Sequence, residues 1–526
     1  MTQSKSKKSG ALLVGMGILL SRIAGLIRER TFAHYFGNSD AGDAFKAALK
    51  IPNFLQNLFG EGVLSASFIP VYAQLIASND KDKHSEASKV ASIVASILFL
   101  FTSLIVILGV FATPFLISVI APGFEGEKRL LTIKLVQIFF PGTGLLVMSA
   151  WCLGVLNSHH KFFLSYAAPV IWNVAIIATL LWFGKNYSQY NLAEITAWGL
   201  VVGSFLQLVI QLPSALKLVK HFKPSLNLQL PHVKTVLKNF FPVVISRGVI
   251  QLSAYIDSIL ASLLPTGAVS ALAYAQTIYL LPVSLFGMSI SASELPAMSA
   301  ISGTNEEVNN ALRIRLDAGL HKIAFFIIPS ICAFLFLGDV LVAALFQSGE
   351  FTYKDTIYVW GVLIGSTIGL LASTLGRLYS STFYSLKDTR TPLKFAFIRV
   401  FLTTILGYLF AFTLPQALHI EASWGTAGLT ASAGIAGWVE FYLLRRALNL
   451  KIGTTGIRVK GQFVLWSCGI LSAVIGFTVK YFTQLQPILH ALVVFSFFGV
   501  AYFIFTYILN VEESRITISK ILRKVL

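Results

Sequence analysis

Apolar runs of about 20 residues recur along the whole of this chain, and they limit its fold more than any other feature. A helix of that length crosses the core of a bilayer, which admits only elements that satisfy their own backbone hydrogen bonds. Composition agrees, because 55% of the 526 residues are hydrophobic and only 12% are charged. The chain is therefore predicted to be an all-α integral membrane protein.

Turn signals such as Gly37-Asn38, Pro122-Gly123 and Ser302-Gly303 separate the apolar runs. We predict about 14 transmembrane helices from this punctuation. Their predicted ranges are 10–35, 40–74, 88–118, 128–155, 163–184, 192–218, 235–264, 267–300, 310–345, 355–385, 391–414, 420–447, 461–482 and 487–510. The first run follows a basic start but lacks a small-residue cleavage site, so we expect a retained first helix.

The formal net charge of +18 indicates membrane topology and argues against nucleic-acid binding, because the basic residues lie between apolar runs. One set of alternate loops is rich in lysine and arginine, including Lys81, Lys161, Lys217, Lys387 and Arg445, whereas the opposite loops carry few. Because basic residues concentrate in cytoplasmic loops, both termini are predicted to be cytoplasmic.

Short segments recur with an offset of about 225 residues, which indicates an internal repeat. Ser21-Arg22 recurs as Ser246-Arg247, and Leu58-Phe59-Gly60 recurs as Leu285-Phe286-Gly287. We predict two six-helix lobes, 1–225 and 226–450, followed by two further helices and a tail in 451–526. An even number of helices per repeat gives both lobes the same orientation, with an axis along the membrane normal, a substrate site between them and alternating access.

Ionisable residues cluster in the first predicted helix, although such groups are costly within a bilayer unless they face a wet cavity or a partner. This helix carries Arg22, Arg28, Glu29 and Arg30. At about 100° per residue, Arg22 and Glu29 lie within about 20° of each other. Arg22 lies near the middle of its run, so these residues are candidates for substrate binding.

A polar stripe is predicted along the second helix. It consists of Asp43, Lys46, Lys50, Asn57 and Glu61. Internal pairing explains part of it, since Asp43 can reach Lys46 or Lys50 and Glu29 can pair with a basic residue of this helix. The surplus of cations favours an anionic substrate, because arginine forks match phosphate. Pro52 is expected to kink this helix or to leave a carbonyl without its partner.

The second half carries fewer charges. Arg247 occupies the repeat position equivalent to Arg22 and is a further substrate-binding candidate, with Gln251 and Ser258 on the same face. Asp257 is predicted to pair with Arg399, and the alternative is that it holds a coupling proton or cation.

Signals of an enzyme are missing from the sequence: it has no P-loop, HExxH motif or nucleophile elbow. Cys152, Cys332 and Cys468 lie far apart inside apolar runs, so we expect small buried residues and no metal site. We predict no enzyme activity and no cofactor. Energy would then come from an ion gradient, the membrane potential or the supply of substrate.

The first two helices resemble the MurJ (MviN) family of lipid II flippases of peptidoglycan synthesis, within the multidrug/oligosaccharidyl-lipid/polysaccharide (MOP) exporter superfamily. The stretches that carry this resemblance are 21–29 (SRIAGLIRE), 50–55 (KIPNFL), 59–62 (FGEG) and 67–70 (SFIP), followed by 346–351 (FQSGEF) and 387–392 (KDTRTP). Fourteen helices also match, with the last two outside the lobes.

The resemblance implies a V-shaped pair of lobes around a cationic cavity that accepts the pyrophosphate and sugar-peptide head group. Arg22, Arg28 and Asp43 match positions that the family uses, and Glu29 replaces the usual aspartate. The last two helices are expected to form a groove for the lipid tail.

Two positions depart from the family pattern. Gln56-Asn57 and Gln276-Thr277 stand where members usually carry an arginine. We expect Arg247 to supply part of the missing charge. The departures leave open a flippase for another polyprenyl-linked saccharide or a drug/cation antiporter. A membrane scaffold without transport is a further alternative, and it predicts that Arg22, Arg28 and Asp43 can be neutralised without loss.

Overall fold

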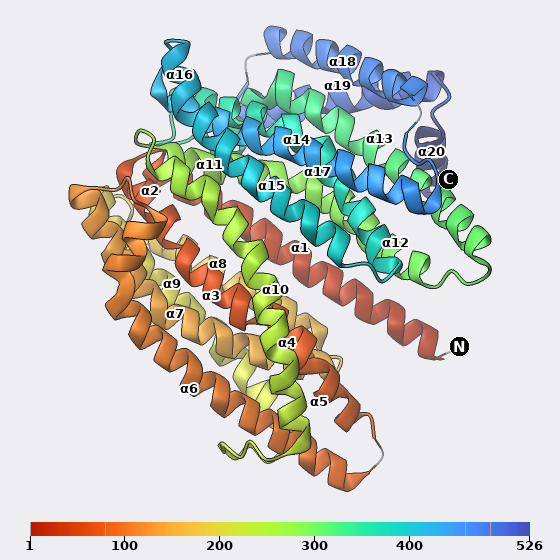
Figure 1. Ribbon diagram of the computed structural model, residues 1–526. Coiled ribbons are helices and arrows are strands. Elements are labelled where there is room, and N and C mark those ends of the chain that lie inside the picture. The colour runs from red at the N-terminus through yellow and green to blue at the C-terminus, as the bar shows by residue number, and fades with distance from the viewer. Residues whose placement is uncertain (1, 79, 458, 484, 526) are drawn as a thin grey trace. The chain divides into compact units, whose positions relative to one another are not determined.

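The computed structural model describes residues 2–78, 80–457, 459–483 and 485–525. Side chains are described except at 2–15, 61, 81, 241, 243, 245–254 and 520–525. The described backbone is helical, with turns and one isolated bridge between Ser348 and Phe351. The predicted all-α class is therefore confirmed. The chain forms two compact units, unit 1 (Met1–Val269) and unit 2 (Ser270–Leu526) (Figure 1).

Within the described residues, 12 helices or broken helices are long and apolar enough to cross a membrane. Two more, α1 (Thr2–Phe36) and α10 (Pro231–Ser262), have 35 and 32 residues, which exceeds the length that a bilayer requires. Together they account for the predicted transmembrane helices. A shorter amphipathic helix, α20 (Glu512–Val525), follows the last of them.

Unit 1 is built around a long central helix, α7 (Gly126–Ser158), which packs against α6 and α9. A second layer pairs α1 with α8, and α10 packs against α3, α4 and α6. The bounds of the other helices are α2 (Asp40–Ala48), α3 (Lys50–Phe59), α4 (Glu61–Ser67), α5 (Ile69–Ile76), α6 (Lys81–Ile120), α8 (Phe162–Phe183) and α9 (Gln189–Val219). This unit extends past α10 to Val269, whereas the predicted repeat boundary at residue 225 stays a prediction.

The predicted helix 40–74 is wrong as one continuous helix, because it is broken into α2, α3, α4 and α5. Pro52 lacks an N–H, and its ring conflicts with the carbonyl of Ala48, where α2 ends. Gly60 separates α3 from α4, and a Cβ atom there would collide with the carbonyl oxygen of Gln56. The expected effect of Pro52 is therefore confirmed, and Gly60 adds a second break.

Unit 2 is organised around α13 (Asn305–Phe346), α14 (Tyr353–Ser385) and α17 (Gly425–Ile452), which pack side by side. The last two membrane helices, α18 (Val459–Phe482) and α19 (Pro487–Ile508), pack against each other and against α13 (Figure 1).

All three cysteines are buried and unpaired, as predicted.

Two predicted helices of unit 2 also contain breaks. Between α11 (Ala268–Pro282) and α12 (Ser289–Ser299) lies a π-helical segment, Val283–Met288. A second π-helical segment, Leu409–Thr413, separates α15 (Arg390–Tyr408) from α16 (Leu414–Ala417). Pro282 and Pro415 lie beside these segments, where the missing N–H interrupts the regular ladder. The helices predicted at 267–300 and 391–414 are therefore confirmed as single spans, Ala268–Ser299 and Arg390–Ala417, and each contains a local π-helical segment.

Candidate functional site

A buried ion network in unit 1 is centred on Glu29. Its carboxylate accepts a hydrogen bond from Arg28 Nη2 at 2.6 Å and forms an ion pair with Lys46 from α2. Glu29 and Lys46 are each only 8% exposed. The predicted pairing of Glu29 with a basic residue of the second helix is confirmed. Removing one member of such a group would leave an uncompensated charge in an apolar environment.

Aromatic rings surround the two cations of this network. The guanidinium of Arg28 lies 4.8 Å from the ring of Trp172, on α8. Lys46 Nζ lies 4.3 Å from the ring of Phe32, on α1. Rings stabilise cations over their faces, and this effect increases away from water. Arg28, Glu29 and Lys46 together carry one positive charge more than their single carboxylate neutralises.

A second network joins α2 to α7 and to the loop after α10 in unit 1. Lys128 Nζ lies 2.8 Å from both Asp40 Oδ1 and Asp43 Oδ2. The backbone N–H of Gly267 donates to Asp43 at 2.8 Å, and the hydroxyl of Thr266 donates to Asp40 at the same distance. Asp43 is only 1% exposed, so its carboxylate is enclosed by these partners. They come from α7 and from the loop after α10, and the spacing along one helix did not predict them.

Gly267 makes this contact possible through its backbone conformation. Its φ is +90°, a region that residues with a Cβ atom rarely adopt. A Cβ atom would also lie 2.8 Å from the carbonyl oxygen of Asn38. We refer to Asp40, Asp43, Lys128, Thr266 and Gly267 as the α2 latch.

Lys50 belongs to a third polar group, between α3 and α10. Asp257 acts on Lys50 electrostatically, and the hydroxyl of Tyr255 donates to the carbonyl oxygen of Lys50 at 2.5 Å. Arg399, in unit 2, donates to Glu440 at 3.1 Å. The predicted ion pair between Asp257 and Arg399 stays a prediction. Helix spacing cannot reveal partners on other helices, so Lys50 and Glu440 were not predicted as partners of these residues.

The remaining predicted site residues are placed as follows. Arg22 on α1 and Asn57 on α3 are exposed side chains. Glu61 begins α4, and Arg247 lies in α10, but both side chains are outside the described part of the structure. Asp43 and Lys46 lie on α2, whereas Lys50 begins α3. The three residues contact three different sets of partners. Lys128 and Trp172 were not predicted, and no short-range pattern marks them.

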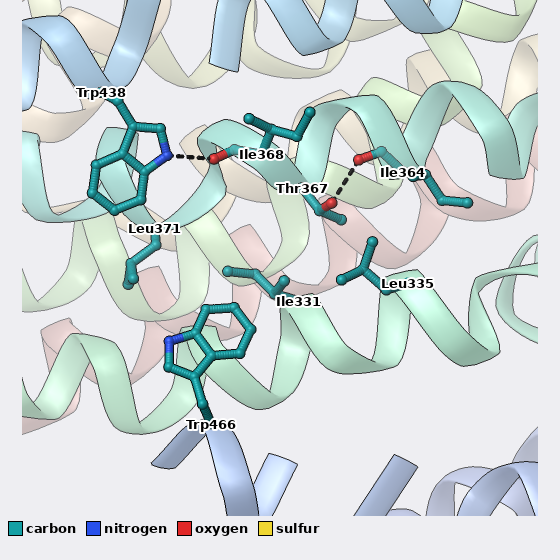
Figure 2. Close-up of a pocket in the computed structure, with 8 residues that line it drawn as sticks. All are labelled: Ile331, Leu335, Ile364, Thr367, Ile368, Leu371, Trp438 and Trp466. Atoms are coloured by element: carbon teal, nitrogen blue, oxygen red, sulfur yellow. Dashed lines mark hydrogen bonds between the residues drawn. The ribbon is translucent and has the colours of Figure 1, made fainter. Parts of the chain in front are cut away.

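Unit 2 contains a pocket of about 300 Å³ between α13, α14, α17 and α18. Figure 2 shows Leu371 between Trp438 and Trp466, with the other side chains of α13 and α14 beside them. Two of the polar groups are already bonded, since Trp438 Nε1 donates to the carbonyl of Ile368 at 2.7 Å and Thr367 donates to that of Ile364 at 2.5 Å. The pocket therefore presents an apolar lining suited to a hydrocarbon chain.

Sequence comparisons give a consistent result. The model of the family described as lipid II flippase MurJ matches residues 32–501. A protein of Rickettsia prowazekii (strain Madrid E), named probable lipid II flippase MurJ, is 30% identical over 491 residues, which covers 91% of each chain. The lipid II flippase MurJ of Burkholderia cenocepacia is 31% identical over 442 residues, which covers 82% of each chain.

Solved structures show the same relationship. A lipid II flippase MurJ in an inward closed conformation is similar with a TM-score of 0.76 and 27% identity, over 95% of this chain and 98% of that one. An inward-facing MATE family transporter of the MOP superfamily has a TM-score of 0.62 and 16% identity, over 82% of this chain and 96% of that one. At that identity the second match shows the fold alone.

Proposed function

Because this chain belongs to the lipid II flippase MurJ family, we propose that it moves lipid II from the cytoplasmic to the periplasmic leaflet of the bacterial inner membrane. The chain is a multi-pass membrane protein, and we propose that both of its termini are cytoplasmic. The observation that carries the proposal is the buried network of Arg28, Glu29 and Lys46, because it places a surplus cation inside a membrane helix pair.

The chemistry of the substrate fits this surplus. Lipid II carries a pyrophosphate, and guanidinium groups bind phosphate oxygens through paired, charge-assisted hydrogen bonds. Arg22 and Arg28 are the candidates for this contact, and Glu29, which also pairs with Lys46, holds Arg28 in place. We further propose Lys50, Asn57, Glu61 and Arg247 as contributors to the same path. No bond of the substrate is made or broken, so no catalytic group is required.

We propose that the α2 latch participates in alternating access. It fixes the segment after α10 onto α2 through two hydrogen bonds to carboxylates. Lys128 pairs with both carboxylates and neutralises one of their two negative charges, so loosening the loop removes the hydrogen-bond donors that stabilise the other. This cost would keep the latch closed until a substrate or an ion compensates for it. The coupling energy would come from an ion gradient, the membrane potential or substrate supply.

The apolar pocket beside α18 supports a role for the C-terminal helices in holding a hydrocarbon chain. Its lining from α13, α14, α17 and α18 is mostly aliphatic and aromatic, and Trp438 and Thr367 are already hydrogen-bonded. We propose that it receives part of the lipid tail while the head group passes through the protein. This assignment agrees with the tail groove that the family resemblance implies.

Depletion and complementation in a peptidoglycan-making bacterium would test the proposed function. Lipid II would be measured on each leaflet after replacement of the resident flippase by this chain, by Arg22→Ala or by Arg28→Ala. We expect the parent to restore outward lipid II and both variants to fail at equal membrane abundance. Arg22→Lys and Arg28→Lys are the matched controls and should retain part of the activity. A parent that is abundant but inactive would contradict the proposal.

A second candidate is a flippase for another polyprenyl-linked saccharide. It is favoured by Gln56 and Thr277 at usual arginine positions, and the hydroxyl of Thr277 is already bonded to the carbonyl of Ala273 at 3.0 Å. Purified protein in liposomes that contain either lipid II or another polyprenyl-pyrophosphate saccharide would separate the two. Gln56→Arg should raise lipid II transport if the charge at this position limits it.

A further inference from the structure

The loop between α17 and α18 is held rigidly at one end of unit 2. The backbone N–H of Gly456 donates to Asp317 Oδ1 on α13 at 2.8 Å. The hydroxyl of Thr455 lies 3.0 Å from the hydroxyl of Tyr379 on α14. Arg445 Nε on α17 donates to the carbonyl of Thr455 at 3.0 Å. Three helices therefore fix the position of this short loop.

Two arginines lie directly against the glycines of this loop. Gly453 and Gly456 have φ values of +90° and +130°. A Cβ atom at Gly456 would lie 2.7 Å from Arg445 Nη2, and one at Gly453 would lie 3.3 Å from Arg313 Nη1. Glycine is needed at Gly456 for both reasons, since the backbone is left-handed and the guanidinium occupies the space. The loop thus brings a guanidinium from α13 and one from α17 onto one short segment.

Positive charge exceeds negative charge around this loop. Arg313, His321 and Arg445 all act electrostatically on the single carboxylate of Asp317. In the described hydrogen bonds, Arg445 donates through Nε to the carbonyl of Thr455. Arg313 donates through Nη2 to Asn310 Oδ1 at 2.7 Å. A guanidinium carries five N–H donors. Most donors of the two arginines therefore remain available to an anion.

Exposed apolar side chains adjoin these arginines. Ile314 is 62% exposed, Leu450 84%, Val459 82% and Phe463 72%. The loop joins two candidate membrane spans, α17 and α18, so it lies where a bilayer changes from hydrocarbon to head groups. A soluble anion would use the arginines alone, whereas a lipid would use the arginines and the apolar side chains together.

We propose that Arg313 and Arg445, arranged around Gly453 and Gly456, bind the phosphate of an anionic phospholipid of the surrounding membrane. Its acyl chains contact Ile314, Val459 and Phe463. Basic pockets between transmembrane helices at a membrane surface are suited to such head groups. Bound there, the lipid connects α13 to the α17–α18 loop and so stabilises the attachment of α18. This site differs from the network of unit 1 and does not depend on which substrate the protein transports.

The test uses the full chain, purified in a nonionic detergent. The melting temperature and the number of retained lipids, by native mass spectrometry, would be measured with phosphatidylglycerol or with phosphatidylcholine of the same acyl chains. We expect phosphatidylglycerol to raise the melting temperature more than phosphatidylcholine. Arg313→Gln combined with Arg445→Gln should remove this difference and weaken phosphatidylglycerol binding by about tenfold or more, since each lost contact to a charged group is worth about 1.5–3 kcal/mol.

Arg446→Gln is the matched control, because Arg446 is exposed, adjacent in sequence and has the same charge. It should bind phosphatidylglycerol as the parent does. If the double variant does not fold, Arg313→Gln alone is informative, because the one described bond of Arg313 is to the nearby Asn310. Equal phosphatidylglycerol binding by parent and Arg313→Gln would overturn the proposal. So would full competition by inorganic phosphate, which would identify a site for a soluble anion.

Discussion

The broken segment α2–α5 of unit 1 and the segment α11–α12 of unit 2, which contains a π-helical stretch, would occupy equivalent positions in the predicted repeat, yet they differ in charge. Residues 40–76 contain Asp40, Asp43, Lys46, Lys50 and Glu61. Residues 268–299 contain one charged residue, Glu294, which pairs with Arg315 at 3.1 Å. Prolines accompany the breaks in both segments.

The comparison shows that an irregular backbone and charged side chains occur independently of each other in the two segments. A break or an irregular turn in a membrane helix redirects the chain and releases backbone groups. Among the described residues of these two segments, α2 takes part in the buried ion network and the α2 latch, whereas Tyr274 on α11 is buried between Phe346 and Phe351. We infer that unit 1 binds the charged part of the substrate and that unit 2 supplies apolar packing.

The largest expected effect tests the ion network. Glu29→Gln leaves Arg28 and Lys46 without their shared carboxylate, so it should cost about 3–5 kcal/mol of stability and abolish transport. Thermal unfolding in detergent and lipid II translocation would measure both. The matched change in unit 2, Glu294→Gln, should cost less than about 1 kcal/mol, because the Arg315 side chain is 44% exposed. Equal costs at the two sites would remove the contrast between the units.

The α2 latch should give the next largest effect. Asp43→Asn keeps an oxygen for the N–H of Gly267 but loses the charge opposite Lys128, and it should cost about 2 kcal/mol. Hydrogen exchange should then increase at residues 263–268. Asp40→Asn is the control with a smaller effect, because the Asp40 side chain is 41% exposed. Unchanged exchange in Asp43→Asn would show that the latch does not hold this loop.

Unit 2 has one buried ion pair of its own, and its replacement sharpens the comparison. Lys480 on α18 lies 2.6 Å from Asp339 on α13, which is 7% exposed. Lys480→Met should cost about 1–2 kcal/mol, since a quarter of the Lys480 side chain is exposed. We expect transport to survive, because this pair attaches α18 and does not contact the proposed path. Loss of transport without loss of stability would show that unit 2 also binds the charged part of the substrate.

The smallest expected effect is a pH dependence at the loop before α15. Hydrogen bonds from Lys451 and from the backbone N–H of Thr391 lower the pKa of Asp388 to about 2. A carboxyl group with a lowered pKa stabilises the fold above its unfolded pKa, about 4, and this contribution is lost as the pH falls from about 4 to about 2. Asp388→Asn should cost less than about 1 kcal/mol at neutral pH and remove this dependence. If Asp388 contributes nothing, the free energy of unfolding would depend on pH in the same way in the parent and in Asp388→Asn.

Local patterns predicted much of the candidate site. The apolar runs placed the charged residues Arg28, Glu29 and Lys46 within membrane helices. The predicted pairing of Glu29 with a basic residue of the second helix is confirmed. Pro52 predicted an interruption, but the length of each fragment also required Gly60 and its contact with Gln56. Such a contact depends on how one turn packs on the next, which composition does not encode.

The sequence by itself determined the all-helical membrane fold, the number of helices and the family, because apolar run length, turn residues and ordered motifs are local properties of the chain. Only the tertiary structure decided which charges meet. Lys128 reaches Asp43 across 85 residues of sequence, Arg28 lies over Trp172, and Arg399 pairs with Glu440. A buried charge is stabilised by the group that packing places beside it, and helical spacing defines neighbours on one helix but not on the next.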